Sequence, residues 1–547
     1  MKAVTCTIPS VRRFFLPGSG RQWAIWALAV LITLPLWAIV RTALGDSRNV
    51  WDHLVRHLMW GLLSNTFWLV LGVGVFTLLL GSSLAWLVAF RDFPGRRIFS
   101  WALALPLAMP GYVLAFVMVG LFDFTGPVQT YLRKLMGGDL PWFPSVRSRG
   151  GVIFTMTLAL YPYVYLMLRE AFQSLSGRTQ EAAQSLGHSP VSAFLRVVLP
   201  MARPWIGASL FLVVMECLAD FGTVAVFNYD TFTTAIYKAW YGLFSIEAAA
   251  QLALTLLSFV FLCAFLEHRE RRRRRYHQST RSSRAIPPPL GPRTKWLATG
   301  YAFLVLFLSV LLPMGQLLAW TLPQLSQIPS RDLLLVGRTF FLGTLAALVV
   351  VGVSLMMSFW QRRSPGTATD LGVRIATLGY AFPGSVLAVG VYLPFALLDN
   401  LLADLKISSF GDGTFQLKGT LLVMLFGYLV RFLAVGHGAV ASGMERCSPQ
   451  LENAAQSLGE SGWGVLRRIH LPLLTPSLLA AGALTMVEVM KEMPLTLMTR
   501  PFGWDTLAVR IFELTSEGLW EQAALPALIL VLVGSIPMML ASRGVRV

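Results

Sequence analysis

The sequence predicts an all-α polytopic membrane protein with about 12 transmembrane helices in two pseudo-twofold halves of six. Three observations predict this fold class. Hydrophobic residues make up 55% of the 547 residues and charged residues only 13%, about half the charged share of roughly 25% in a soluble domain. Twelve stretches are apolar over the roughly 20 residues that a bilayer-crossing helix needs. One short segment occurs twice, 272 residues apart, which is nearly half of the chain.

The apolar stretches are spread along the whole chain. In the first half they lie near 22–42, 62–90, 98–122, 151–170, 205–228 and 246–266, and in the second half near 296–320, 336–360, 372–398, 419–443, 477–498 and 523–542. The first stretch is too long for a removable signal peptide and lacks its small-residue cleavage pattern, so we interpret it as a retained span.

Lysine and arginine predict the orientation, because they are enriched on the cytosolic side of membrane proteins. With the N-terminus in the cytosol, the cytosolic segments hold 30 of the 45 basic residues and 9 of the 27 acidic ones. That distribution leaves +21 on the cytosolic side and −3 elsewhere, so both termini are predicted to be cytosolic. The formal charge of +18 then describes an orientation, and no nucleic-acid partner is predicted.

The densest basic run, Arg269 and Arg271 to Arg275, directly follows the sixth span, and Pro287 to Pro289 come after it. It is either a patch for nucleic acid or anionic lipid, or a stop-transfer anchor and linker. We favour the linker, because the run abuts the span. The predicted organisation is a first half over 1–268, a basic proline-rich linker over 269–294 and a second half over 295–547.

The repeated segment lies between the fourth and fifth span of each half. Its copies read Glu181-Ala-Ala-Gln-Ser-Leu-Gly187, continuing to Leu199-Pro200 and Pro204, and Asn453-Ala-Ala-Gln-Ser-Leu-Gly459, continuing to Leu471-Pro472 and Pro476. Over 181–204 the copies share 11 of 24 residues without a gap. Because each half has an even number of spans, the halves are parallel and related by an axis along the membrane normal.

Each copy predicts a helix–turn–helix. Ala-Ala-Gln-Ser-Leu favours a short helix, and Gly187 or Gly459 supplies a left-handed cap. Ser189-Pro190 in the first copy and Ser448-Pro449 in the second are typical of an N-cap and first turn, while Pro200 and Pro472 are predicted to end the second helix. The small residues favour docking in a groove of a partner protein. The alternative is an amphipathic pair lying on the lipid headgroups.

At these residues the sequence resembles the membrane permease subunits of ABC importers, whose cytosolic loop carries Glu-Ala-Ala, three residues, Gly, about nine residues and Leu-Pro. With two copies the chain resembles a fused, binding-protein-dependent permease of type I architecture in a bacterial inner membrane. The resemblance implies that coupling loops over 177–204 and 449–476 each seat a coupling helix in a cytosolic ATPase subunit. The implied coupling residues are Glu181, Ala182, Ala183, Gly187 and Arg196, and Glu452, Ala454, Ala455, Gly459 and Arg468. The second copy departs from the pattern, because it has Asn453 at the position of Glu181 and its acid, Glu452, comes one residue earlier.

Other segments resemble the ferric-iron branch of these permeases. They are Tyr161-Pro-Tyr-Val-Tyr165, Leu218-Ala-Asp-Phe-Gly-Thr223, Thr231-Phe-Thr-Thr-Ala-Ile-Tyr237 and Lys491-Glu-Met-Pro-Leu-Thr-Leu497 with Arg500-Pro-Phe502. This likeness implies ferric iron as the substrate. Because related permeases share the coupling loop, thiamine or another small solute is the alternative.

The chain lacks the sequence of an ATPase, because it contains no Gly-Lys dipeptide and hence no phosphate-binding loop. It is predicted to be no enzyme and to bind no cofactor of its own. The resemblance implies two cytosolic ABC ATPase subunits, which hold ATP and Mg, and a periplasmic substrate-binding protein. Glu513, Glu517 and Glu521 form an i, i+4, i+8 pattern that either receives the binding protein or is a solvated helix face.

Two pairs of acids lie within predicted spans, where each charge costs about 2.5–3.5 kcal/mol. Glu216 and Asp220 share a helix face in the first half, and the 272-residue offset places Glu488 and Glu492 equivalently in the second. Gly222 and Pro494 follow, so both helices are predicted to loosen just beyond the acids. The four carboxylates suit transient passage of ferric iron, a hard cation. The alternatives are internal pairing, as of Glu488 with Lys491, and a contact between the halves.

A proton-coupled secondary transporter is the rival class. It also accommodates six-plus-six helices and a basic central loop. It needs no helix–turn–helix between the fourth and fifth spans, so the repeat argues against it.

Overall fold

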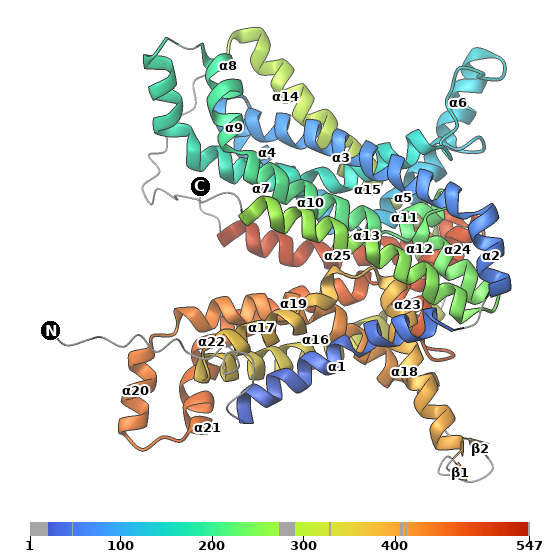
Figure 1. Cartoon of the computed structure of the whole chain (residues 1–547). Coiled ribbons are helices and arrows are strands. Elements are labelled where there is room, and N and C mark those ends of the chain that lie inside the picture. Colours follow the sequence, from blue (N-terminus) through green and yellow to red (C-terminus); the bar gives the residue numbers. More distant parts are fainter. Residues whose placement is uncertain are drawn as a thin grey trace. The chain divides into compact units, whose positions relative to one another are not determined.

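The computed structural model describes residues 20–45, 48–187, 189–272, 290–327, 330–404, 409–410, 413–414 and 416–544. Helices account for its regular structure, apart from a two-residue antiparallel pairing of β1 (Ser409–Phe410) with β2 (Gly413–Thr414). The helices form two compact units (Figure 1).

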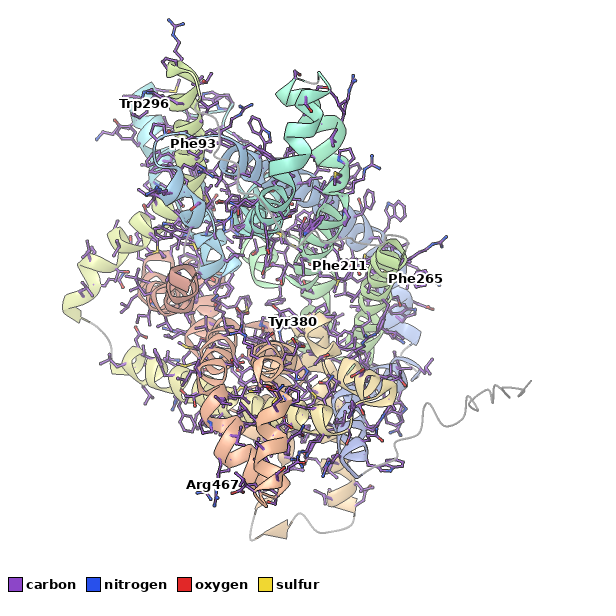
Figure 2. All side chains as sticks on the ribbon, turned by 90° about the vertical axis from the view of Figure 1, so that its left-hand side faces the viewer. Phe93, Phe211, Phe265, Trp296, Tyr380 and Arg467 are labelled. Carbon is purple, nitrogen blue, oxygen red and sulfur yellow. The ribbon has the colours of Figure 1, made fainter. Side chains whose placement is uncertain are left out.

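Most predicted spans are single apolar helices. Among the described residues ten helices are long and apolar enough to cross a membrane, and a bent pair, Phe194–Met201 with Arg203–Ala219, makes 11. The last predicted span falls in α25 (Trp520–Gly544), which contributes the shorter apolar stretch Trp520–Ser535. Figure 2 shows aromatic side chains such as Phe265 and Trp296 on the outside of the helices, each 61% exposed, as suits helices solvated by lipid. The chain is an all-α polytopic membrane protein, as predicted.

Two predicted spans are interrupted by proline, which cannot donate an N–H to the preceding turn. The predicted span at 98–122 consists of α4 (Arg96–Ala102), a 3-10 turn at Leu105–Ala108 and α5 (Gly111–Phe122). The predicted span at 372–398 consists of α17 (Thr367–Ala376), a 3-10 turn at Leu378–Ala381 and α18 (Gly384–Asp404). Pro110 and Pro383 stand directly before α5 and α18. Both breaks place a helix N-terminus inside an apolar stretch.

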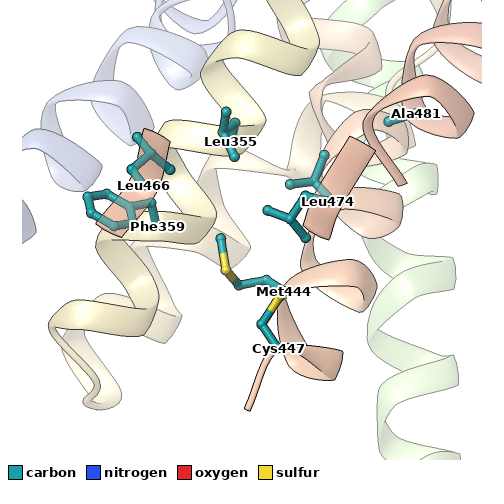
Figure 3. Close-up of a cluster of buried hydrophobic side chains, with 8 residues drawn as sticks. Leu355, Phe359, Met444, Cys447, Leu466, Leu474 and Ala481 are labelled. Carbon is teal, nitrogen blue, oxygen red and sulfur yellow. The ribbon is translucent and has the colours of Figure 1, made fainter. Parts of the chain in front are cut away.

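One unit consists of α1 (Gly20–Ala43), most of α16 (Ser330–Arg363), α17, α18, α19 (Leu421–Arg446), α20 (Pro449–Ser457), α21 (Gly462–Val465), α22 (Leu471–Lys491) and α23 (Pro494–Thr499). Glycines let α1 pack closely on α17 and α18, as small residues do in membranes. A Cβ on Gly390 would lie 2.8 Å from the carbonyl oxygen of Pro35, and one on Gly372 would lie 2.9 Å from Ile25 Cγ2. Elsewhere in this unit α16, α19 and α22 meet in a cluster of buried apolar side chains (Figure 3).

The other unit has α3 and α7 at its centre. It contains α2 (Arg48–His57), α3 (Met59–Phe90), α4, α5, α6 (Pro127–Met136), α7 (Arg149–Ser185), α8 (Pro190–Ala193), α9 (Leu199–Met201), α10 (Arg203–Ala219), α11 (Gly222–Val226), α12 (Phe232–Tyr237), α13 (Ile246–Arg272), α14 (Pro292–Leu306), α15 (Leu312–Thr321), α24 (Leu507–Ser516) and α25. A Cβ on Gly81 of α3 would lie 2.7 Å from the Cβ of Val164 on α7. The two helices therefore approach closely because a glycine separates them.

The compact units do not coincide with the predicted sequence halves 1–268 and 295–547. Helix α1 comes from the first half of the sequence but packs with helices of the second, whereas α14, α15, α24 and α25 pack with helices of the first. The rings of Phe116 on α5 and Trp320 on α15, for example, stack with centroids 6.3 Å apart. The boundaries of the duplication stay a prediction, and most of the predicted linker, 273–289, lies outside the described residues.

Candidate functional site

The first predicted coupling loop begins as a continuation of α7, which runs to Ser185 without a break. Gly187 follows with a φ of +88°, the left-handed conformation that glycine adopts at little cost. The Ser189 side chain then accepts a hydrogen bond of 3.3 Å from the backbone N–H of Ser192, and α8 and a π-helical turn at Phe194–Val198 follow. The predicted glycine and serine caps are confirmed here.

The second loop has a separate helix. After α19 ends, the Ser448 side chain accepts a hydrogen bond of 3.3 Å from the N–H of Gln450 and begins α20. Gly459 ends it with a φ of +85°, and the N–H of Glu460 donates to the Ala455 carbonyl at 3.0 Å, as in a Schellman motif. Within its unit, α20 and α21 project beyond the ends of α19 and α22 (Figure 1). Both predicted caps are confirmed, and Ser461, which accepts from the N–H of Gly464, adds one that was not predicted.

The prediction that a proline ends the second helix is confirmed for Pro200, because the helix ends at Met201, but it is wrong for Pro472. Each proline follows a π-helical turn, at Phe194–Val198 or Leu466–His470, and stands at the start of α9 or α22. In the second copy the chain therefore continues directly into α22, whereas in the first a 61° bend follows before α10.

The predicted coupling residues differ in how far their side chains are exposed. In the second copy Ala454 is exposed and Ala455 is buried, while Glu452 is turned inward with 13% of its side chain exposed. Arg196 and Arg468 are both exposed on their π-turns, and Arg468 forms an ion pair with Glu460. Neighbouring Arg467 projects away from the ribbon in Figure 2. The side chains of Glu181, Ala182 and Ala183 lie outside the described part of the chain.

The most exposed apolar side chains of the loops were not predicted. Leu186 is 82% exposed and Leu458 is 86% exposed, each directly before the left-handed glycine of its copy. Trp463, on α21, is 67% exposed. The repeat contained a signal for them, because Leu186 and Leu458 occupy the same position in both copies. The sequence prediction did not use it.

Both helices that carry the intramembrane acids break where predicted. Helix α10 ends at Ala219 and α22 ends at Lys491, so Asp220 and Glu492 occupy equivalent extended positions after them. The short helices α11 and α23 then begin at Gly222 and Pro494. In each half, one acid of the pair therefore lies at the break and the other lies one turn before it.

Asp220 caps the short helix that follows it. Its carboxylate accepts a 2.9 Å hydrogen bond from the hydroxyl of Thr223 and one of 3.2 Å from the N–H of Val224. Its own carbonyl accepts from the hydroxyl of Thr233 at 2.7 Å. A negative charge at a helix N-terminus is stabilised by the free N–H groups there.

Glu492 does the same in the second half and also forms a buried ion pair. It accepts a 3.1 Å hydrogen bond from the N–H of Leu495, and its other oxygen lies 3.0 Å from Nε of Arg431. The glutamate is 6% exposed and the arginine side chain 16%. The count of cytosolic charges took 431–476 as one cytosolic segment and so included Arg431, which lies within α19. That placement is wrong, because the arginine is a counter-ion for an acid at the helix break.

A proline–glycine pair packs against each break. A Cβ on Gly111 would lie 2.9 Å from the Thr223 hydroxyl, and one on Gly384 would lie 2.5 Å from Oε1 of Glu492. The N-termini of α5 and α18 thus approach the capped carboxylates because the residue there has no side chain. The sequence offered this signal as Pro110-Gly111 and Pro383-Gly384, which occur at matching places in both halves.

Of the acids one turn before the breaks, Glu488 is more accessible than Glu492. The Glu488 side chain is 39% exposed and lies 3.8 Å from Nζ of Lys491, so the pairing considered as an alternative is observed. Glu216 is half-buried. The predicted outer pattern is interrupted, because Glu513 lies in α24, Glu521 lies in α25, and Glu517 lies between them. The prediction of a single helical stripe is wrong.

A duplicated scaffold of membrane helices, with a helix–turn–helix loop in each copy and a broken helix after each loop, defines a membrane transport subunit. The class rests on these repeated features. The chain belongs to the family described as the binding-protein-dependent transport system inner membrane component, whose model matches residues 77–275 and again 341–545.

Relatives agree with that class. The chain is 30% identical over 533 residues to the Fe(3+)-transport system permease protein FbpB 2 of Haemophilus influenzae, covering 94% of this chain and 97% of the relative. It is 23% identical over 508 residues to the ferric transport system permease protein FbpB of Actinobacillus pleuropneumoniae, covering 86% and 71%. Over a shorter stretch of 157 residues, 29% of this chain and 59% of the relative, it is 36% identical to a putative 2-aminoethylphosphonate transport system permease protein, PhnV, of Salmonella typhimurium.

Proposed function

We propose that the chain is the transmembrane permease of an ATP-driven importer that receives ferric iron from a periplasmic binding protein. The observation that carries the proposal is the likeness to the Fe(3+) permease, which extends over 94% of the chain. The repeated loops support it, because they supply two equivalent docking elements for two ATPase subunits. We place both termini in the cytosol and the chain in the bacterial inner membrane.

ATP binding and hydrolysis, with Mg, then belong to the partner subunits. Each coupling loop offers an exposed leucine beside a left-handed glycine, and exposed apolar side chains of this kind mark interaction sites. Closure of the ATPase dimer would move both loops and rock the two halves between inward and outward access.

Docking is tested with Gly187→Asp and Gly459→Asp. A Cβ at either glycine meets no atom of this chain within 4 Å, so the substitution acts on the backbone turn and on whatever docks there. We expect both variants to lose co-purification with the ATPase and to lose transport. Gly137→Asp is the matched control, because Gly137 ends α6 with a φ of +73° in equally open space. Co-purification of both loop variants with the ATPase at normal yield would contradict the proposal.

For the substrate path we propose the four carboxylates Glu216, Asp220, Glu488 and Glu492. Oxygen ligands suit a hard cation such as ferric iron. Asp220 and Glu492 also cap α11 and α23 at the breaks, and Glu216 and Glu488 lie one turn earlier on the same helices.

The path is tested by uptake of radioactive iron into proteoliposomes that contain the whole complex. Glu216→Gln with Glu488→Gln should lose uptake while assembly and basal ATP hydrolysis persist. Asp230→Asn is the control, because Asp230 forms an exposed ion pair with Lys238. Normal uptake in the double variant would refute the role of the acids.

The same preparation separates the alternatives. Uptake of thiamine, or of another small solute, in place of iron would keep the importer class and change the substrate. Uptake that follows a proton gradient without ATP would favour a secondary transporter.

A further inference from the structure

The two coupling loops are attached to their own units by unlike contacts. The 272-residue offset pairs Phe90 with Arg362, Phe172 with Met444, Phe194 with Leu466 and Val198 with His470. These four positions lie at the base of each loop. One is at the end of α3 or α16, one is within α7 or near the end of α19, and two are in the π-turn. The first copy fills them with apolar residues, whereas the second places an arginine and a histidine there.

In the second copy Arg362 joins three segments. It stands in the last turn of α16, its Nε pairs with Oε1 of Glu452 on α20, and its terminal nitrogens donate to the carbonyls of Met444 and Cys447. Those carbonyls belong to the end of α19, where a helix leaves its last acceptors unsatisfied. The guanidinium fork therefore fixes α20 relative to both α16 and α19.

His470 brings the π-turn to the same carboxylate. Its Nε2 lies 3.4 Å from Oε1 of Glu452, its side chain is 1% exposed, and its ring meets Phe359 edge-on at 6.0 Å. Below these groups, Phe359, Met444, Cys447 and Leu466 belong to the buried cluster of Figure 3. His470 is also the last residue before α22, so displacement of Glu452 acts on the helix that directly precedes Glu492.

Among the side chains that the structure describes in the first copy, aromatic rings occupy three of the four equivalent positions. Phe90, Phe172 and Phe194 form a triangle with centroids 5.4 to 5.9 Å apart, and Val198 is buried. Ring contacts tolerate small sliding, because aromatic pairs are favourable over centroid distances of about 4.5–7 Å in both offset-stacked and edge-to-face arrangements, whereas a forked guanidinium with three acceptors fixes both distance and angle.

We propose that Arg362 and Glu452 form an ionic joint, with the ring of His470 packed beside it, that transmits movement of the second coupling loop to α16 and α22. The first loop moves on an aromatic joint, so the two loops couple to their units with different stiffness. This inference rests on the proposed function, since it presumes an ATPase seated on each loop. It also gives Glu452, displaced by one residue from the pattern of the first copy, a role within the permease, whereas exposed Asn453 faces outward.

The test is the number of substrate molecules imported per ATP hydrolysed by the complete complex in proteoliposomes. Arg362→Met should lower that ratio at least tenfold, while the ATPase still co-purifies and hydrolyses ATP. Glu452→Gln, which keeps size and shape, should lower it three- to tenfold. Arg362→Lys keeps the charge but not the forked guanidinium, so its import ratio should lie between those of Arg362→Met and the unmodified protein. Phe90→Leu, at the equivalent position of the aromatic joint, should change the ratio less than twofold.

A ratio that stays normal in both Arg362→Met and Glu452→Gln would overturn the ionic joint. The joint would also be overturned if the import ratio fell in step with thermal stability across the variants and Arg362→Lys recovered neither. That result would indicate general destabilisation of the protein. Failure of the proposed function is recognised separately, since the unmodified complex would then show no ATP-dependent uptake at all.

Discussion

The ion pair between Arg431 and Glu492 makes a quantitative prediction about the helix break in the second half. The charges are 3.0 Å apart and largely shielded from solvent, so their attraction is about 5 kcal/mol at an effective dielectric of roughly 20. Desolvation offsets much of this, yet removing one partner leaves the other buried without a counter-charge, which costs about 3–5 kcal/mol. Arg431→Met should therefore destabilise the protein strongly, although methionine fills a similar volume.

The assay is a double-mutant cycle on purified protein in detergent, with thermal unfolding followed by tryptophan fluorescence. Glu492→Gln keeps an acceptor for the N–H of Leu495 but removes the charge, so it should also destabilise. The double variant should recover most of either loss, because neither charge then remains unpaired. Asp220→Asn is the matched variant in the first half and should cost only about 1 kcal/mol, since its caps are hydrogen bonds. Additive losses in the double variant would refute the reasoning.

Three further predictions concern packing, exposure and reactivity. Gly384→Ala should destabilise by about 1–3 kcal/mol in the same thermal assay, because its Cβ would lie 2.5 Å from Oε1 of Glu492; an unchanged midpoint would contradict this close approach. Leu186→Asp and Leu458→Asp should shift stability by less than about 0.5 kcal/mol, since both side chains are exposed, but should abolish pull-down of the ATPase; retained pull-down would argue against docking at these tips. Burial raises the pKa of the Cys447 thiol, so less thiolate is present at a given pH. Maleimide labelling measured by mass spectrometry should therefore be slower than in the unfolded chain and should accelerate as pH rises; equal rates would contradict the burial.

Local features of the loops and breaks were predictable because they depend on residue types at short spacing. Gly187 and Gly459 indicated left-handed caps, and Gly222 and Pro494 indicated where the acid-bearing helices end. The repeat predicted these features in both halves from the residue pattern alone. Equivalent acids at 220 and 492 likewise followed from a constant offset.

Features that depend on tertiary packing were not predictable. Arg431 was counted with the loop charges because hydropathy cannot tell a buried counter-ion from a residue just outside a span. Pro472 signalled a helix end, but it follows the π-turn at Leu466–His470 and stands in the first turn of α22 instead. Nothing in a linear pattern indicated that Arg362, over 80 residues from Cys447, caps the end of α19.

The packing of α1 determines when this helix can fold relative to synthesis of the chain. The side chain of Gln22 on α1 donates to the hydroxyl of Thr369 on α17, and these residues are 347 positions apart. At a synthesis rate of roughly 5–20 residues per second, the ribosome needs about 17–70 s to make that partner after α1 has emerged. Throughout this interval the glycine-lined surfaces that receive α1 do not yet exist, and the helix waits in the bilayer among lipids. A chain interrupted after its first six spans would therefore leave its first helix without partners, and neither unit can be completed from the first half of the sequence alone.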